Sequence, residues 1–155
     1  MDIVVKTALQ DMSYISLVQD ILENKQYKQL GYCTHHTHLT RLVHCIHVSY
    51  SCYLKAKKIK YAYIRELVRG ALLHDFFLYD YRTEKGIKKH WLHGLFHPKA
   101  SLIEAERQFK LNDIERNLIL THMFPLSFHI PRTRASWLVI FYDKYWAIKE
   151  KFSKQ

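Results

Sequence analysis

The stretch LVRGALLHD, residues 67–75, is the part of the sequence that most constrains the fold. Apolar residues recur at helical spacing from Ile64 to Ala71, which predicts a helix over about Ala62 to Phe77. Asp75 continues that face, and His74 lies beside it. Burying an unpaired charge is costly, and a metal ion would remove that cost. The stretch therefore predicts a core helix ending in a metal-binding pair.

Other candidate metal ligands follow one another along the chain at intervals of roughly 20 to 30 residues, about one helix plus a connection. Residues this widely spaced meet only when several helices fold around one point, unlike the ligands of a zinc finger, which lie on short local knuckles. The candidate ligands are His44, His74, Asp75, His97, His122 and Asp143. We expect them to form a site inside a helical core.

Helical periodicity recurs along the rest of the chain, and no strand-like alternation of useful length is present. The fold class is therefore predicted to be all-α, with about six helices. Pro98 is interpreted as the first residue of a helix, with His97 next to its cap. The final helix is apolar over most of its circumference, which predicts burial among the others. The expected helices cover about 11–24, 39–57, 62–77, a segment from Pro98, a segment from Asn112 to before Pro125, and 134–151.

The segment from Leu78 to Phe96 has no clear periodicity and is rich in Tyr, Lys and His. An irregular connection of this length is uncommon in a compact domain and is often a lid or a binding loop. The alternative is a short helix around Lys88 to Leu95.

Length and composition favour one folded domain. The chain has 155 residues, of which 48% are hydrophobic and 14% aromatic, with only 4 Gly and 3 Pro. We expect a single domain over 1–155, with its core over about 38–150 and the N-terminal helix at about 11–24 packed on it.

Membrane and disulfide classes are not indicated. No apolar run approaches the length of a membrane span and the N-terminus does not resemble a leader, so we expect a cytoplasmic protein without a membrane partner. The 3 Cys contain no CxxC pair, which argues against a disulfide framework or a cysteine zinc site. Cys45 and Cys52 are interpreted as small packing residues.

The charge balance is strongly basic, with a formal net charge of +10. A positive protein attracts phosphate-bearing partners, either small phosphoesters or nucleic acid. The excess lysines could equally serve only to solvate the surface.

The ordered ligand set resembles the HD superfamily of metal-dependent phosphohydrolases, whose signature is a His, a His-Asp doublet on the next helix and a distant Asp. The stretch TRLVHCIHV, residues 40–48, is similar to the family's first motif, in which an Arg precedes the His by three. The apolar run into His74-Asp75 is similar to its second, and Asp143 matches the closing Asp. His97 and His122 resemble the additional histidines of members that hold two metals.

This resemblance implies an HD-like helical bundle and a dinuclear site. One ion would take His44, His74, Asp75 and Asp143, and the other Asp75, His97 and His122. A water shared by two cations has a lowered pKa and can attack phosphorus, so the implied activity is phosphoester hydrolysis on a small phosphate-bearing substrate, with His74 and Asp75 as catalytic residues. Such ligands suit Mn, Fe, Ni, Co, Mg or Zn. His47, one turn from His44, is distinguished from it only by the family register.

Three cationic residues are candidates for substrate binding. Arg41 could grip phosphate through its guanidinium fork, or could be a surface charge. Lys88 and Lys89 could attract an anionic substrate from the irregular segment, or could belong to a solvated loop. The cyclic-dinucleotide branch of the family is not supported, because its Gly-Tyr-Pro motif is absent and Leu78 replaces its lysine.

Two other functions stay open. A minority branch of the same superfamily uses four His and two Asp to hold a mixed-valent iron pair and acts as an oxygenase. A non-catalytic basic module for nucleic acid is motivated by charge alone, because no nucleic-acid fold signature is present. The substrate, the metal and the oligomeric state are not determined by the sequence.

Overall fold

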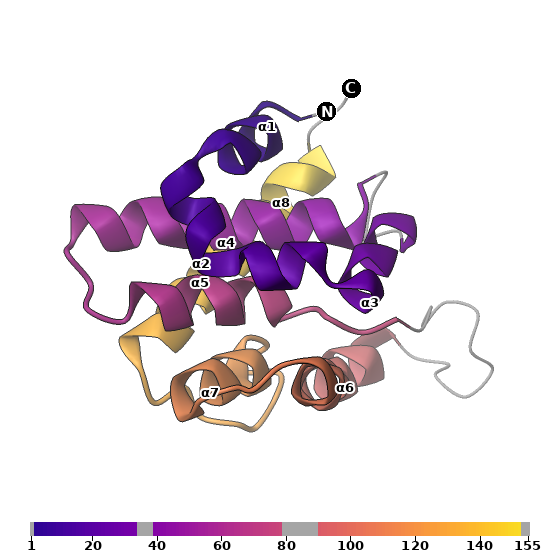
Figure 1. The fold of residues 1–155 in the computed structure, drawn as a ribbon. Coiled ribbons are helices and arrows are strands. Elements are labelled where there is room, and N and C mark those ends of the chain that lie inside the picture. The colour runs from indigo at the N-terminus through magenta and orange to yellow at the C-terminus, as the bar shows by residue number, and fades with distance from the viewer. Residues whose placement is uncertain (1, 34–38, 79–89, 153–155) are drawn as a thin grey trace.

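The computed structural model describes residues 2–33, 39–78 and 90–152, with side chains from residue 94 onward in the last range. Over these residues the fold consists of helices, without a strand, which confirms the all-α prediction (Figure 1). The elements are α1 (Ile3–Gln10), α2 (Met12–Glu23), α3 (Lys25–Lys28), a 3₁₀ turn η1 (Gln29–Tyr32), α4 (Arg41–Lys58), α5 (Ile64–Leu73), α6 (His90–Gln108), α7 (Asp113–Thr121) and α8 (Arg134–Phe152).

Two of the eight α-helices in the described ranges, α1 and α3, were not expected from the sequence. Both are short and begin with a side-chain cap, Asp2 for α1 and Asn24 for α3, each accepting bonds from two backbone N–H groups. Short helices of this kind depend on caps and contacts more than on periodicity. The predicted helices over 11–24, 39–57 and 134–151 agree with α2, α4 and α8 to within two residues.

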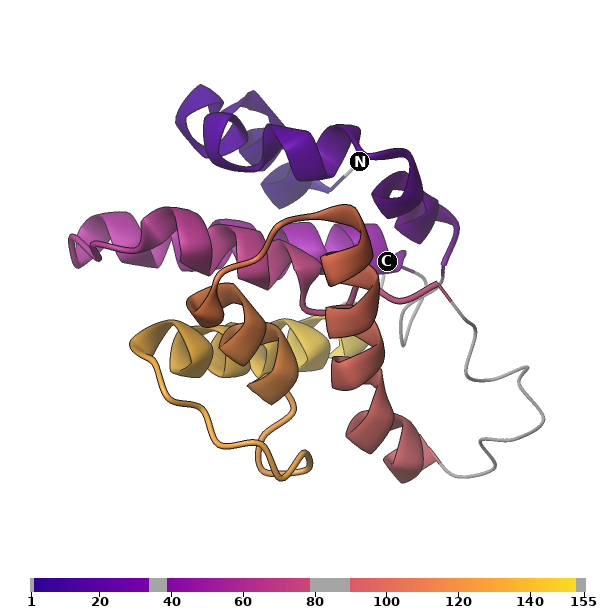
Figure 2. The same cartoon turned by 60° about the horizontal axis from the view of Figure 1, so that its bottom comes forward.

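Helices α4 and α5 form the centre of the molecule, with α1 to α3 on one side and α6, α7 and α8 on the other (Figure 2). Buried hydroxyl groups connect these layers. Tyr14 of α2 donates to Ser49 of α4 at 2.9 Å, and Ser49 donates to the carbonyl of Val68 in α5 at 2.7 Å. Tyr27 donates to the carbonyl of Leu72 at 2.7 Å. Each of these buried hydroxyls is satisfied, so the polar atoms do not weaken the apolar core.

Helix α5 ends at Leu73, one residue before the His-Asp pair, so the expected helix through Phe77 is too long. The chain leaves the helix because the Phe76 N–H bonds the Leu73 carbonyl and the Phe77 N–H bonds the Asp75 carbonyl, which are turn bonds. The two candidate ligands therefore lie on a turn at the C-terminal end of a buried helix.

Pro98 does not begin a helix. It lies inside α6, which already starts at His90, and His97 is an interior helical residue. The sequence cue was ambiguous because proline is frequent in the first helical turn but is also accommodated inside helices, where it removes one hydrogen bond. Residues 90–96 of the segment predicted to be irregular are helical, in agreement with the alternative of a helix around Lys88 to Leu95 where the two overlap, and residues 79–89 lie outside the described residues.

Helix α8 is not buried on all sides. Its inner face carries Val139, Asp143, Trp146 and Glu150, while Trp137 and Phe141 are exposed to 52% and 62%. The apolar residues of α8 do not by themselves define which face of the helix is buried. The buried face is marked instead by two acidic side chains, Asp143 and Glu150, which point inward. Their partners are described below.

Cys33, Cys45 and Cys52 are free, and the last two are buried as expected. Among the described helices, none combines the length and the apolar character that crossing a membrane requires.

Candidate metal centre

The structure brings all six predicted ligand residues together, and all six are buried. Five of them form two groups, in each of which the ligand atoms lie within 4.8 Å of one another, and Asp75 belongs to both groups. The first group contains His44 and His74 with Asp75, and the second contains His97 and His122 with Asp75. Asp143 adjoins the first group, with its Oδ1 at 3.2 Å from the Nε2 of His44. These buried His and Asp groups could hold a metal ion.

The second group is compact. Asp75 Oδ1 lies 3.2 Å from the Nε2 of His97 and 3.4 Å from the Nε2 of His122. The two Nε2 atoms are 2.7 Å apart. Ligands at about 2.0–2.2 Å from one cation are spaced at about 3 Å, so these three atoms need little movement to share an ion.

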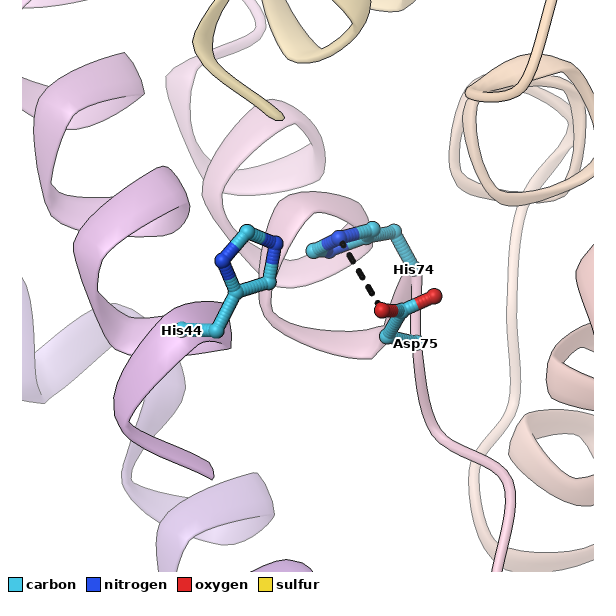
Figure 3. Close-up of side chains that lie close together, drawn as sticks. All are labelled: His44, His74 and Asp75. Atoms are coloured by element: carbon cyan, nitrogen blue, oxygen red, sulfur yellow. Dashed lines mark ion pairs between the residues drawn. The ribbon is translucent and has the colours of Figure 1, made fainter. Parts of the chain in front are cut away.

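The first group is more open. His74 Nε2 lies 3.7 Å from Asp143 Oδ1 and 3.9 Å from Asp75 Oδ2, and both carboxylates lie beside the ring (Figure 3 shows the contact with Asp75). His44 approaches from α4 on the other side of His74, with the two ring centroids 5.4 Å apart. Four side chains from α4, α8 and the turn after α5 thus surround one point.

Two of the histidines are oriented by the helix ends that carry them. His74 directly follows α5 and His122 directly follows α7, and each Nδ1 lies 2.7 Å from the carbonyl oxygen three residues earlier. A carbonyl only accepts, so Nδ1 carries the hydrogen and donates it, which leaves the Nε2 lone pair for a cation. The helix terminus therefore fixes both the tautomer and the direction of the ligand atom.

One ring nitrogen of the cluster lacks a hydrogen bond within the described part of the chain. Among the described residues, the buried Nε2 of His74 has no hydrogen bond. Leaving a buried polar atom unsatisfied costs about 1–3 kcal/mol, and such atoms are rare in folded proteins. An orphaned imidazole nitrogen facing two carboxylates fits a cation site, so the residues present suit a metal ion.

Electrostatics inside the cluster are strongly coupled. Although burial lowers it, the neighbouring carboxylates of Asp75 and Asp143 hold the pKa of His74 above its ordinary value of 6.5. Burial, together with the nearby His97 and His74, lowers the pKa of His122 to about 4. Although burial raises it, the hydrogen bond with His44 and the close contact with the His74 ring hold the pKa of Asp143 well below its ordinary value. At neutral pH the cluster therefore contains an ionised Asp143 and a neutral His122, both in metal-binding form.

His44, rather than His47, is the α4 histidine that joins the candidate centre. His47 lies on the far side of a carboxylate that the sequence analysis missed, Glu150 of α8. Glu150 is buried and lies 3.0 Å from His44 Nδ1 and 2.8 Å from His47 Nδ1. Its position seven residues after Asp143, and so on the same helical face, was the available signal.

Arg41 is not a surface charge. Its side chain is buried, its guanidinium donates to the carbonyl of Phe77, and its Cζ lies 3.6 Å from the centroid of the Phe77 ring. Cation–π contact and hydrogen bond together explain why the charge is tolerated inside. Lys88 and Lys89 lie outside the described residues.

A cationic side chain beside the centre had no predicted role. Lys144 Nζ lies 3.2 Å from Asp143 Oδ2, and its side chain is 43% exposed. It lines a cavity of about 450 Å³ together with Ala147, Ile148 and Lys151. Two lysines therefore line this cavity, and one of them, Lys144, pairs with a candidate metal ligand.

No protein-family model, no curated protein and no solved structure matches this chain. What can be said of its function therefore rests on its own residues: an all-helical protein with a buried cluster of His and Asp that could hold a metal ion.

Proposed function

We propose that this protein is a metal-dependent phosphohydrolase of the HD type, acting on a small phosphoester. The observation that supports this most is the sharing of Asp75 between two buried ligand groups. A carboxylate has two oxygens, and those of Asp75 face different groups, Oδ1 toward His97 and His122 and Oδ2 toward His74. Such an arrangement suits two cations held close together.

Two divalent ions in this position would polarise phosphoryl oxygens and lower the pKa of a bound water. The residues of the chain supply the rest. His44, His74 and Asp143 would hold one ion, His97 and His122 the other, and Asp75 both. Asp75 is 7% exposed and His97 5%, so bulk water is largely excluded from the ligand atoms.

The surroundings favour a phosphate-bearing substrate. Lys144 and Lys151 line one cavity, Lys144 also pairs with Asp143, and an anionic substrate would be attracted to their ammonium groups. Arg41 is held by Phe77 and its buried Nε has no hydrogen-bond partner among the described residues, so part of the guanidinium is available for another acceptor. We therefore keep Arg41 as a candidate phosphate ligand, with Lys144 as an additional one.

The test begins with metal content. The protein is purified without added metal, analysed for bound elements, stripped with chelator, and reloaded separately with Mn, Fe, Co, Ni, Mg or Zn. Each form is assayed with p-nitrophenyl phosphate and bis-p-nitrophenyl phosphate as model monoester and diester. We expect two ions per chain and metal-dependent hydrolysis that is lost in Asp75→Asn and His74→Ala.

The same experiment separates the alternatives. Hydrolysis that survives these substitutions would refute the proposal. An iron-loaded form with a mixed-valent EPR signal, oxygen uptake and no phosphoesterase activity would instead identify an oxygenase. Salt-sensitive binding of nucleic acid by the stripped protein, without hydrolysis, would identify a basic binding module.

A further inference from the structure

Glu150 connects the candidate metal centre to a histidine outside it. Its Oε2 lies 3.0 Å from His44 Nδ1, and its Oε1 lies 2.8 Å from His47 Nδ1. On the other edge of the His47 ring, Nε2 lies 3.1 Å from Oδ1 of Asp2, the residue that caps α1. The result is a continuous series of side chains from the N-terminal cap, through α4 and α8, to a candidate ligand.

Glu150 determines which nitrogen of His44 is available. Because an ionised carboxylate only accepts, His44 must donate from Nδ1, which leaves Nε2 facing Asp143 and His74. His74 and His122 are oriented in the same way, but by backbone carbonyls. A carboxylate in this place also increases the basicity of the imidazole, which strengthens its bond to a metal.

The buried carboxylate of Glu150 has a second histidine partner, His47. A carboxylate oxygen lies at each ring nitrogen, so His47 bridges the side chains of Glu150 and Asp2. Its ring is stacked on Trp146, with centroids 4.1 Å apart, which fixes its position further. Although partial burial raises it, hydrogen bonds from His47 and the Val4 N–H lower the pKa of Asp2, as expected for a carboxylate that accepts both bonds.

We propose that Glu150 and His47 are positioning residues of the metal centre: Glu150 holds His44 in the metal-binding tautomer, and His47 holds the Glu150 side chain in place. This inference rests on the proposed function, because it requires a cation at His44. It makes a specific claim that the ligand set does not, namely that the two ions differ in their dependence on Glu150. The ion at His44 depends on it, because Glu150 orients that ligand, whereas His122 of the other group is oriented by a backbone carbonyl.

The test measures the affinity of each ion separately. Stripped protein is titrated with Co(II), whose visible spectrum reports both affinity and coordination, in competition with a chelating dye. In Glu150→Gln we expect one of two ions to bind about 10- to 100-fold more weakly, the size typical of losing a carboxylate behind a metal-bound histidine, with the second ion unchanged. The substitution replaces one carboxylate oxygen by an NH₂ group, which cannot accept a hydrogen bond from an Nδ1 atom, and it removes the negative charge behind His44.

Two further variants make the result specific. His47→Gln removes the imidazole that bridges Glu150 and Asp2 but leaves Glu150 in the sequence, and we expect a smaller loss of affinity at the same ion. Glu115→Gln is the matched control, because Glu115 is a similarly buried carboxylate on α7 that pairs with Arg69 rather than with a histidine. It should lower the free energy of unfolding and leave both Co(II) affinities unchanged.

The outcomes are distinguishable. If the wild-type protein binds no ion, the proposed function fails, and with it this inference. If the wild type binds two ions and Glu150→Gln retains both at wild-type affinity, or loses both in parallel with its stability, the positioning role is overturned while the proposed function stands. A weakened single ion in Glu150→Gln, with Glu115→Gln unaffected, supports it.

Discussion

Two buried charged clusters lie along the same short helix, and they are built differently. Near the middle of α5, Arg69 donates from Nε to Glu115 of α7 at 3.0 Å, and its Nη1 donates to Asp20 of α2. Just beyond the C-terminal end of α5, the His-Asp cluster contains an imidazole nitrogen, Nε2 of His74, without a hydrogen bond among the described residues.

The difference indicates separate roles for the two clusters. The Arg69 cluster is internally complete: its cation faces two carboxylates, and the Glu115 carboxylate also accepts from the N–H of Asn112 at the start of α7. It connects three helices and needs nothing more. The His-Asp cluster has ligand atoms directed at one another, an arrangement whose energy improves when an ion enters. One cluster contributes to stability, and the other has the groups that could bind a metal ion.

Of the substitutions considered, Asp75→Asn should have the largest effect on metal binding. Its effect on the stability of the fold should be smaller than that of Arg69→Met. It removes the carboxylate shared by both ligand groups, so we expect both ions to be lost, with affinity lowered by more than about 100-fold. In the metal-free protein the free energy of unfolding should change less than in the Arg69 variant described next. Metal analysis checks the predicted loss of both ions, and urea unfolding checks the predicted change in stability. An Asp75→Asn protein that keeps two ions would remove the distinction between the clusters.

The substitution Arg69→Met should destabilise the fold and leave metal binding unchanged. Removing one partner leaves Glu115 buried without its cation, which typically costs roughly 3–5 kcal/mol of unfolding free energy. The double variant Arg69→Met with Glu115→Gln should recover part of that loss, because Glu115 no longer leaves a charge unpaired. Urea unfolding measures the cost, and Co(II) titration of the folded fraction should give wild-type affinity. Weaker metal binding in this variant would mean that the clusters are coupled.

Metal affinity should fall with decreasing pH. The pKa of His74 is raised above 6.5, so at lower pH this ligand is protonated and a cation must displace the proton, which costs about tenfold in affinity for each pH unit. His122, with a pKa of about 4, adds no such dependence above about pH 5. Titrations from about pH 5.5 to 8 in buffers of different ionisation enthalpy should show proton release on metal uptake. An affinity that is flat over this range would contradict the assignment of His74.

The substitution Gly70→Ala should have the smallest effect. A Cβ at this position would lie 3.0 Å from Cδ2 and 3.1 Å from Cδ1 of Leu118, a buried residue of α7. Overpacking typically costs about 1–3 kcal/mol, and replacing a helical glycine by alanine returns about 1 kcal/mol, so we expect a net loss of about 1 kcal/mol. Thermal unfolding measures it, with Leu118→Ala in the Gly70→Ala background as the control that provides space. A stabilised single variant would show that Leu118 moves freely.

The cluster could be predicted from the sequence because its members are His and Asp residues, which are common metal ligands, and because they follow one another at the interval of successive helices. His44, His97 and Asp143 lie far apart along the chain, and only their order suggested that they meet. Helix α4 was predicted to within two residues for a similar reason, since its apolar periodicity is long and uninterrupted. Patterns of this kind can be recognised in the sequence without knowledge of the tertiary contacts.

Features that depend on tertiary contacts could not be predicted in the same way. Glu150 stands between Lys149 and Lys151, where a glutamate suggests a solvated ion pair, and only the packing of α8 against α4 turns it toward two histidines. Arg41 was considered as a surface charge because its contact with Phe77 joins residues far apart along the chain. Pro98 was misinterpreted because a proline marks either the start or the interior of a helix, and the sequence does not distinguish them.

The ends of α5 and α7 have a geometric consequence. Each helix stops one residue before a histidine, so the length of the helix determines the direction in which the imidazole points. An α-helix turns by about 100° per residue, and a single alanine inserted before His74 or His122 would swing that ring out of the cluster without altering any side chain. In this protein the residue at which a helix ends therefore helps to set the geometry of the candidate metal centre.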